Sequence, residues 1–296
     1  MKSWMSVAVW VSLILTGCDT ASRHQEPLII STDIWIGAAP LYYAHAKGWL
    51  KEANIEMLQA DSIDENLRLY DKKASDVITG TEHEYLRLKK IHHDLIPIII
   101  YDRSYGGDVV FSNHTIEQLK QSKEKIDVFL ELDTVGEDML NYFIAEHNLT
   151  REQFNIYNRS QEEIENIDNS NVKKPLICVT YHPHDLVLEK RGLQEVASSK
   201  NDSYVVVDSF MTSRKTYLQH KEQLHILAML MNKAVTSYHN DPKSFYTTVK
   251  PYLKSLSFEE FEQMRTHIQW INKQDITPMM RQKLEKLEYP VSELIE

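Results

Sequence analysis

Carboxylate and aromatic side chains recur near the ends of the strands predicted along this chain. Five carboxylates stand near predicted strand ends or helix starts: Asp33, Glu84, Asp108, Glu131 and Asp208. Trp35, Tyr105 and Tyr181 add flat aromatic faces. Carboxylates bind cations through charge-assisted hydrogen bonds, and aromatic rings bind them through cation–π contacts. The set therefore predicts a site for a cationic or neutral ligand, such as an aminopyrimidine, a polyamine or a quaternary ammonium compound. An anion would instead require Arg, Lys and backbone N–H groups.

Several of these residues also have a structural interpretation. Asp33 and Asp208 could cap helices or act as hinge carboxylates, and Asp108 could stabilise a turn after two glycines. Thr81 could contact a ligand through its hydroxyl or cap the following helix. His182 could serve as a pH-sensitive donor. The sequence leaves these alternatives open.

Catalytic and metal-binding patterns are not assembled in the sequence. The histidines that could serve as ligands have no HxxxH spacing, and no CxxC motif accompanies them: His83, His92, His93, His182 and His184. A Gly-x-Ser-x-Gly motif and a phosphate-binding loop are also missing. Cys178 lies in the apolar run 176–179 and is predicted to be an inert core residue. We therefore predict no catalytic residue, no metal and no cofactor, and expect that the protein is not an enzyme.

Composition limits the class of protein. The 296 residues correspond to about two domains, and 42% hydrophobic with 26% charged residues is typical of a globular chain. With 43 Asp and Glu against 33 Lys and Arg, the net charge is -10, which argues against nucleic-acid binding. Two cysteines cannot form a disulfide framework.

The N-terminus has the pattern of an export signal. Residues 4–16 are almost wholly apolar and too short to span a bilayer, which takes about 20 residues. The run ends in Leu15-Thr16-Gly17-Cys18, which resembles the bacterial lipobox. We expect a signal peptide over 1–17, lipidation of Cys18 with acyl chains such as palmitate, and a tether over 18–27. Asp19 resembles an inner-membrane retention signal, which predicts a lipid anchor at the periplasmic face of the inner membrane. The alternative is a buried N-terminal helix that ends in Gly-Cys.

The remaining chain alternates between strands and helices, which predicts an α/β fold with largely parallel sheets. The strands are predicted over 28–32, 55–58, 74–79, 95–101, 126–132, 154–157, 176–181 and 205–207. The helices are predicted over 38–53, 62–70, 82–90, 116–120, 136–147, 161–168, 221–238, 242–253, 258–270 and 279–287. Ligands of open α/β sheets bind outside the carboxyl ends of strands, which is why the residues there matter.

Six segments, in order, resemble motifs of one family. They are 33–50 (an opening DIWIGAAPLYYA with KGWL after it), 76–86 (DVITGTEHEYL), 104–110 (SYGGDVV), 128–140 (VFLELDTVGEDML), 179–183 (VTYHP) and 205–210 (VVVDSF). The resemblance is to periplasmic substrate-binding proteins of ABC importers, in the nitrate, sulfonate, taurine and thiamine-pyrimidine-precursor group. It covers about residues 28–271. At His182, relatives often carry a glutamate.

The resemblance implies a two-lobed type II periplasmic-binding-protein fold that closes on its ligand by hinge motion. Lobe I would comprise 28–111 plus 205–296, and lobe II, inserted into it, 112–204. The implied ligand-binding residues are Trp35, Thr81, Glu84, Asp108, Glu131, Tyr181, His182 and Asp208. The expected partners are a small-molecule ligand and an ABC permease, with the protein itself a monomer. A sensor that reports its ligand to a membrane signalling protein is the alternative, since closure serves both roles.

Overall fold

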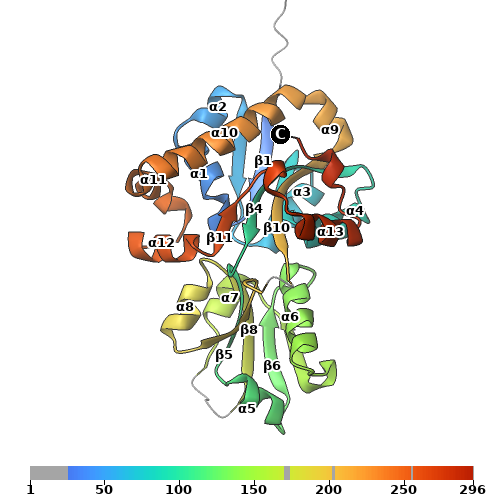
Figure 1. Ribbon diagram of the computed structural model, residues 1–296, viewed down its shortest axis with the longest axis vertical. Coiled ribbons are helices and arrows are strands. Elements are labelled where there is room, and N and C mark those ends of the chain that lie inside the picture. Colours follow the sequence, from blue (N-terminus) through green and yellow to red (C-terminus); the bar gives the residue numbers. More distant parts are fainter. Residues whose placement is uncertain (1–25, 170–173, 202–203, 255, 296) are drawn as a thin grey trace, which may run out of the picture.

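Two β-sheets, each packed with helices, form two lobes joined by crossing segments (Figure 1). The computed structural model describes residues 26–169, 174–201, 204–254 and 256–295. The predicted signal peptide, Cys18 and most of the predicted tether lie outside these residues. No helix within the described ranges is both long and apolar enough to cross a bilayer.

The first lobe is built on a six-stranded sheet of order β11-β4-β10-β3-β1-β2. Its strands are β1 (Leu28–Thr32), β2 (Ile55–Gln59), β3 (Val77–Thr81), β4 (Leu95–Ser104), β10 (Val206–Ser213) and β11 (Ile268–Trp270). Strand β1 is parallel to β2 and β3, whereas β10 is antiparallel to both β3 and β4. The prediction of largely parallel sheets is therefore wrong for this lobe, because β10 returns from the second lobe and enters the sheet from the opposite end.

Helices cover both faces of this sheet (Figure 1). The α-helices are α1 (Ala39–Ala46), α2 (Trp49–Glu52), α3 (Ile63–Asp71), α4 (Glu82–Lys89), α9 (Arg214–Gln219), α10 (Lys221–Asn240), α11 (Pro242–Val249), α12 (Phe258–Arg265) and α13 (Pro278–Lys286). The 3-10 helices are η1 (Ile36–Ala38), η3 (Lys250–Tyr252), η4 (Lys273–Asp275) and η5 (Val291–Glu293). The helix predicted over 38–53 is divided in two, since Gly48 adopts a left-handed conformation with φ +77° between α1 and α2.

The second lobe is built on a five-stranded sheet of order β7-β6-β8-β5-β9. Its strands are β5 (Asp108–Ser112), β6 (Ile126–Leu130), β7 (Phe154–Asn158), β8 (Leu176–Tyr181) and β9 (Gln194–Ser198). Its helices are α5 (Ile116–Gln121), α6 (Val135–Glu146), α7 (Gln161–Glu165), α8 (Asp185–Lys190) and the 3-10 helix η2 (Arg151–Gln153). Because β5 pairs with β8 and β9, this sheet begins at Asp108, and the lobe boundary predicted between 111 and 112 falls inside a strand.

The α/β class and the insertion of one lobe into the other are confirmed. Strands β5, β9 and β11 were not predicted. All three pair antiparallel with their neighbours, and none has the long apolar run that marks a central parallel strand.

Each lobe has its own apolar core. In the first lobe, Tyr43 stacks on Phe245 with ring centroids 4.6 Å apart. In the second lobe, Leu130 and Phe143 are fully buried between the sheet and its helices. Cys178 is also fully buried, and burial raises the pKa of its thiol to about 12. The prediction of an inert core cysteine is therefore confirmed.

Two chain segments cross between the lobes side by side. The hydroxyl oxygens of Ser104 and Ser199 lie 2.7 Å apart, and Ser199 Oγ also accepts the Gly106 N–H at 2.9 Å. Gly106 has φ +113°, a conformation that L side chains rarely adopt, so this crossing requires glycine. These bonds hold the ends of β4 and β9 together at the point where the lobes meet.

Candidate functional site

Strand register brings the predicted carboxylates to the facing edges of the two sheets. In the first lobe, Asp33 directly follows β1, and Asp208 in β10 is paired with Thr81 on one side and Asp102 on the other. In the second lobe, Glu131 directly follows β6, and Asp108 is paired with Tyr181. Residues far apart in the sequence therefore meet between the lobes.

Two adjoining cavities lie where the lobes meet. Residues of both lobes line the first cavity, and residues of the second lobe line the second. The first is lined by Asp33, Trp35, Ile63, Gly80, Thr81, Glu84, Asp108, Val135, Tyr181 and Asp208. The second is lined by Asp108, Glu131, Thr134, Val135, Gly136, Met139, Gln161, Val179, Thr180 and Tyr181. Asp108, Val135 and Tyr181 line both. Seven of the eight predicted site residues thus lie around these cavities, and His182 does not.

The charge of this region is strongly negative. Among the described residues that line the two cavities, none is Lys, Arg or His. The nearby Arg103 packs its guanidinium over the Tyr105 ring, 5.1 Å from the centroid, and neither residue lines a cavity. Tyr105 is therefore not part of the site as predicted. Across the described ranges, no group of His, Cys, Asp or Glu is arranged to hold a metal ion.

Burial shifts the protonation of the cavity carboxyls. Desolvation raises the pKa of Asp33 to about 7, and the neighbouring charges of Glu84 and Asp108 act in the same direction. The pKa of Asp108 rises to about 6 and that of Glu131 to about 7, in both cases mainly by burial. These groups therefore exchange protons near neutral pH instead of standing fully ionised.

Asp102 forms a buried carboxyl pair with Asp208. The Trp35 indole donates its Nε1–H to Asp102 Oδ2 at 2.8 Å, while burial and the adjacent Asp102 charge raise the pKa of Asp208 well above its usual range. Asp102 was not predicted as a site residue. The available signal in the sequence was an acid directly after the apolar run predicted as strand 95–101. An acid at a fully buried strand position must have a partner.

Glu82 is a second buried carboxyl that the sequence did not single out. Its Oε2 accepts the Val207 N–H at 2.9 Å, and burial raises its pKa to about 8. Its position at the start of α4 resembles that of an ordinary solvent-exposed first-turn acid. Only the return of β10 beside α4 buries it.

Three polar atoms around the cavities are buried without a hydrogen-bond partner within the described chain. They are Asp108 Oδ2, Glu131 Oε1 and the Tyr181 hydroxyl. The residues that carry them are 6%, 3% and 5% exposed, respectively. Buried polar groups are nearly always hydrogen-bonded, so this cluster marks the region as a candidate binding site.

The other Glu131 oxygen is held in place by a polar chain in the second lobe. The Thr180 hydroxyl donates to Gln161 Oε1 at 2.7 Å, and Gln161 Nε2 donates to Glu131 Oε2 at 3.0 Å. Gln161 was not predicted as a site residue, since nothing in its sequence context distinguishes it from a helix-start residue. The chain orients the Glu131 carboxyl without using Oε1.

Thr81 and Glu84 have a structural role in the same region. Thr81 caps α4, and Glu84 completes a capping box by accepting the Thr81 N–H at 2.9 Å through Oε2. The Thr81 hydroxyl also donates to this oxygen. Glu84 Oε1 accepts the Val135 N–H, at the first residue of α6, at 2.8 Å. The cap alternative for Thr81 is thus the one observed, and both oxygens of Glu84 are engaged.

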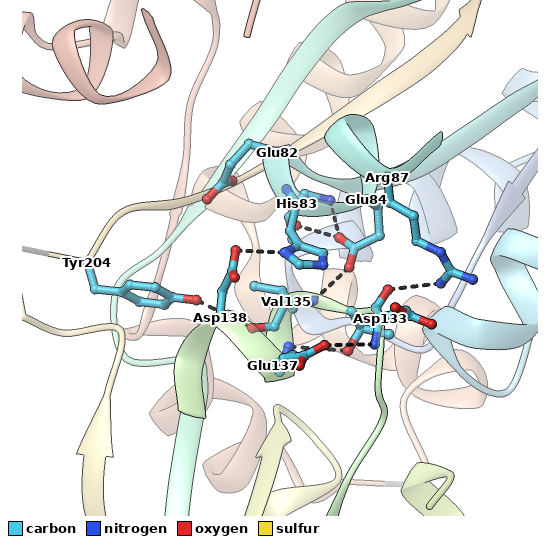
Figure 2. Close-up of polar contacts among 12 residues, drawn as sticks. Glu82, His83, Glu84, Arg87, Asp133, Val135, Glu137, Asp138 and Tyr204 are labelled. Atoms are coloured by element: carbon cyan, nitrogen blue, oxygen red, sulfur yellow. Dashed lines mark hydrogen bonds and ion pairs between the residues drawn. The ribbon is translucent and has the colours of Figure 1, made fainter. Parts of the chain in front are cut away.

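The contact between α4 and α6 joins the lobes directly, as Figure 2 shows. His83 Nδ1 lies 2.6 Å from Asp138 Oδ2, and Arg87 donates to the Asp133 carbonyl at 2.9 Å. Burial disfavours the charged form of His83, but the hydrogen bond to Asp138 and nearby carboxylates outweigh it and raise the His83 pKa to about 9. The lobes are therefore held in contact beside the cavities.

Trp35 is positioned by a close backbone approach. A Cβ atom on Gly37 would lie 1.9 Å from Asp102 Oδ2 and 2.2 Å from Trp35 Nε1, so only glycine leaves room for their hydrogen bond. The Trp35 ring meets the Tyr181 ring edge to face, with centroids 6.1 Å apart. One wall of the first cavity is therefore aromatic.

His182 points away from these cavities. Its backbone N–H donates to the Gly107 carbonyl at 2.9 Å, and its side chain contacts Asp185 and, across the lobes, His267, each at 2.9 Å. It lines a separate cavity of about 440 Å³ between α8 and α12. The placement of His182 with the other site residues is corrected, because the turn after β8 carries its side chain toward α12.

Comparisons with known proteins find similarity in structure. No family model matches the sequence, and no curated protein matches it. The structure is similar to the alkanesulfonate-binding protein SsuA from Xanthomonas axonopodis pv. citri, with a TM-score of 0.70, 14% identity, and 92% of this chain and 96% of that chain covered. The chain has the periplasmic-binding-protein fold.

Two further solved structures have the same fold. The ligand-binding component of an ABC-type import system from Staphylococcus aureus has a TM-score of 0.68 and 12% identity, with 92% of this chain and 97% of that chain covered. The periplasmic nitrate-binding protein NrtA from Synechocystis PCC 6803 has a TM-score of 0.61 and 11% identity, with 82% and 70% covered. The predicted two-lobed fold is therefore confirmed.

Proposed function

We propose that this chain is the extracytoplasmic solute-binding lipoprotein of an ABC importer, anchored through Cys18. The observation that carries the proposal is the first cavity, which residues of both lobes line, together with three buried polar atoms without partners that the second lobe presents around the two cavities. A ligand bound in the first cavity contacts both lobes at once, so its binding free energy favours the closed conformation. A permease that recognises only that conformation receives loaded protein.

The similar structures support this role. Their names describe binding of alkanesulfonates and nitrate and membership of an ABC-type import system. Their fold, combined with the export signal in this sequence, is what an importer component requires.

The ligand of this chain is proposed to be a cation or a neutral amine. A sulfonate or nitrate ion in these cavities would face Asp33, Asp108 and Glu131 with no lining Lys, Arg or His among the described residues. A protonated amine instead donates hydrogen bonds to the carboxylates and stacks on Trp35 or Tyr181. The site residues proposed to contact it are Trp35, Asp108, Glu131, Tyr181 and Asp208, together with Asp33.

A calorimetric screen tests the ligand class. Primary amines, choline and aminopyrimidines are titrated into the purified chain, with taurine, an alkanesulfonate and nitrate as the opposing set. Binding of an amine that is weakened at least tenfold in Asp108→Asn supports the carboxylate site. Binding of a sulfonate or nitrate would contradict the proposed ligand class but would agree with a solute-binding role.

The transport role has its own test. Deletion of the gene should abolish uptake of the identified ligand by intact cells, and a Cys18→Ser variant, which cannot be lipidated, should reduce it. Unchanged uptake with a lost transcriptional response to the ligand would instead support the sensor alternative.

A further inference from the structure

We propose that the two adjoining cavities form one site for a ligand with two cationic groups, a short diammonium compound, with one group in each cavity. The inference rests on the proposed solute-binding function and specifies its ligand. Three features carry it: the placement of carboxyls at both ends, the unsatisfied atoms, and the apolar surface between them.

Each cavity has its own carboxyls. Of these two cavities, Asp33 and Asp208 line the first and Glu131 lines the second. Glu131 also lines a more open cavity that contains Arg68 and Arg159. Asp108 lines both of the adjoining cavities. A ligand with two separated ammonium groups can pair with a carboxyl of each cavity at once.

The unsatisfied acceptors have the same distribution. Glu131 lines the second cavity and Asp108 lines both, and each has one carboxyl oxygen, Glu131 Oε1 and Asp108 Oδ2, without a hydrogen-bond partner within the described residues. Glu131 is only 3% exposed, so solvent cannot readily satisfy this oxygen. The Gln161–Thr180 chain holds the carboxyl in this orientation without using Oε1. An ammonium group has three donors and no acceptor, which matches such a set.

The surface between the two ends is apolar. Val135 and the Tyr181 ring line both cavities, and Met139 and Val179 extend this surface into the second one. Side chains of this kind pack against methylene groups. The arrangement therefore suits an aliphatic chain that separates two ammonium groups, rather than a compact cation such as choline.

Glu84 does not count toward the ligand's charge, because both its oxygens already accept hydrogen bonds from Thr81 and Val135. Burial and the adjacent Asp102 charge raise the pKa of Asp208 well above its usual range, which favours its neutral form. Asp33 and Asp108 in the first cavity and Glu131 in the second are left as the groups that a dication can neutralise.

A matched pair of probes tests the proposal on the full chain, purified in mild detergent. By calorimetry at pH 7.5, 1,4-diaminobutane is compared with 4-amino-1-butanol, which has the same length but carries a hydroxyl in place of one ammonium. Diamines with three and five methylene groups are included to vary the distance between the two ammonium groups. We expect the best diamine to bind at least tenfold more tightly than its amino alcohol, which corresponds to about 1.4 kcal/mol.

The Glu131→Gln variant locates the second ammonium group. It should remove most of the difference in affinity between the diamine and the amino alcohol, and leave the affinity for the amino alcohol within about twofold. Asp108→Asn should weaken the binding of both compounds. Glu162→Gln, which removes an exposed carboxylate on the same helix as Gln161, is the charge-matched control and should change neither. Thermal unfolding of each variant verifies that it is folded.

Other results would overturn the inference. Equal affinity of the diamine and the amino alcohol in the unmodified chain, with no effect of Glu131→Gln, would indicate a site for one cation and would leave the proposed function intact. The absence of binding by every diamine would overturn the inference, and sulfonate binding in the same experiment would contradict the ligand class as well. The comparison of probes in the unmodified chain does not depend on the folding of any variant.

Discussion

Two groups of carboxylates meet at the boundary between the lobes, and they differ in how their oxygens are used. Where α4 meets α6, Glu84 accepts N–H groups from both lobes, and Asp138 pairs with His83 (Figure 2). At the cavities, Asp108 and Glu131 each have one carboxyl oxygen without a hydrogen-bond partner in the described chain. Carboxylates thus stabilise the structure where α4 meets α6, whereas at the cavities they have oxygens that could still accept hydrogen bonds.

The comparison teaches that burial alone does not identify a ligand-binding acid. Glu84 and Glu131 are 1% and 3% exposed, respectively. What separates them is whether the fold supplies donors for both oxygens. Substitution of an engaged carboxylate should therefore destabilise the protein, and substitution of an unsatisfied one should not.

The largest effect is expected for Glu84→Ala. It removes the acceptor of two buried backbone N–H groups, those of Thr81 and Val135, and each such loss costs about 1–3 kcal/mol. We expect the free energy of unfolding in urea to fall by about 3 kcal/mol.

A second helix-start glutamate is the matched control for Glu84. Glu65 accepts the Asp61 N–H at 2.8 Å in an exposed position of α3, so Glu65→Ala should cost less than about 1 kcal/mol. Equal losses in the two variants would mean that the contact of Glu84 across the lobes adds nothing.

Gly37→Ala tests the engaged pair of Trp35 and Asp102. The new methyl group would overlap Asp102 Oδ2 and Trp35 Nε1, and the hydrogen bond between them must break. Overpacking of this kind costs about 1–3 kcal/mol, and we expect about 2 kcal/mol together with a changed tryptophan fluorescence spectrum.

Gly136→Ala is the control for the methyl group itself. Its Cβ would meet no atom closer than 3.4 Å, so the stability should change by less than about 1 kcal/mol. A stable Gly37→Ala variant with an unchanged spectrum would show that the approach of Gly37 to Asp102 is not a constraint.

The pH dependence of stability tests the unsatisfied group. The Glu131 carboxyl has a pKa raised from 4.5 to about 7, so the folded state binds more protons than the unfolded state between these values. The free energy of unfolding must therefore fall as pH rises from about 4.5 to 7, and it levels off above that. Asp33 and Asp108 act in the same direction. We expect a decrease of about 2 kcal/mol between pH 5 and pH 8, measured by urea denaturation.

Glu131→Gln should reduce this slope and raise stability at pH 8 by about 1 kcal/mol, since it removes a charge that the fold does not fully compensate. A variant less stable than the unmodified chain at pH 8 would contradict the assignment of Glu131 to the unsatisfied group.

The smallest effect is expected for Asp138→Asn. Its side chain is 51% exposed, and exposed ion pairs contribute about 0–1 kcal/mol. We expect a loss of about 0.5 kcal/mol and a shift of the solution ensemble toward open lobes, measured by small-angle X-ray scattering.

Asp71→Asn is the control for this pair, since Asp71 contacts His92 at 2.7 Å within the first lobe. It should cost as much stability without any change in scattering. A compact ensemble in both variants would mean that the His83–Asp138 contact does not hold the lobes together.

Much of the fold follows from local patterns. The strands at 28–32 and 176–181 have the predicted ends, because each is a short, largely apolar run between a proline and a polar residue. Strand β5 was missed and the lobe boundary was misplaced, since pairing with β8 and β9 is a long-range property that five residues do not encode.

The chain order of acids and strands by itself determined that carboxylates gather at the facing sheet edges, because strand ends in an α/β sheet share an edge. Only the tertiary structure decided their roles. The contact with α6 engages Glu84, the Gln161 chain orients Glu131, the pairing of β10 with β4 sets Asp208 beside Asp102, and the turn after β8 turns His182 away. Each outcome depends on a partner at least 30 residues away in the sequence, or on the direction of a turn. The type of a residue and its sequence neighbours specify neither the partner nor the turn direction.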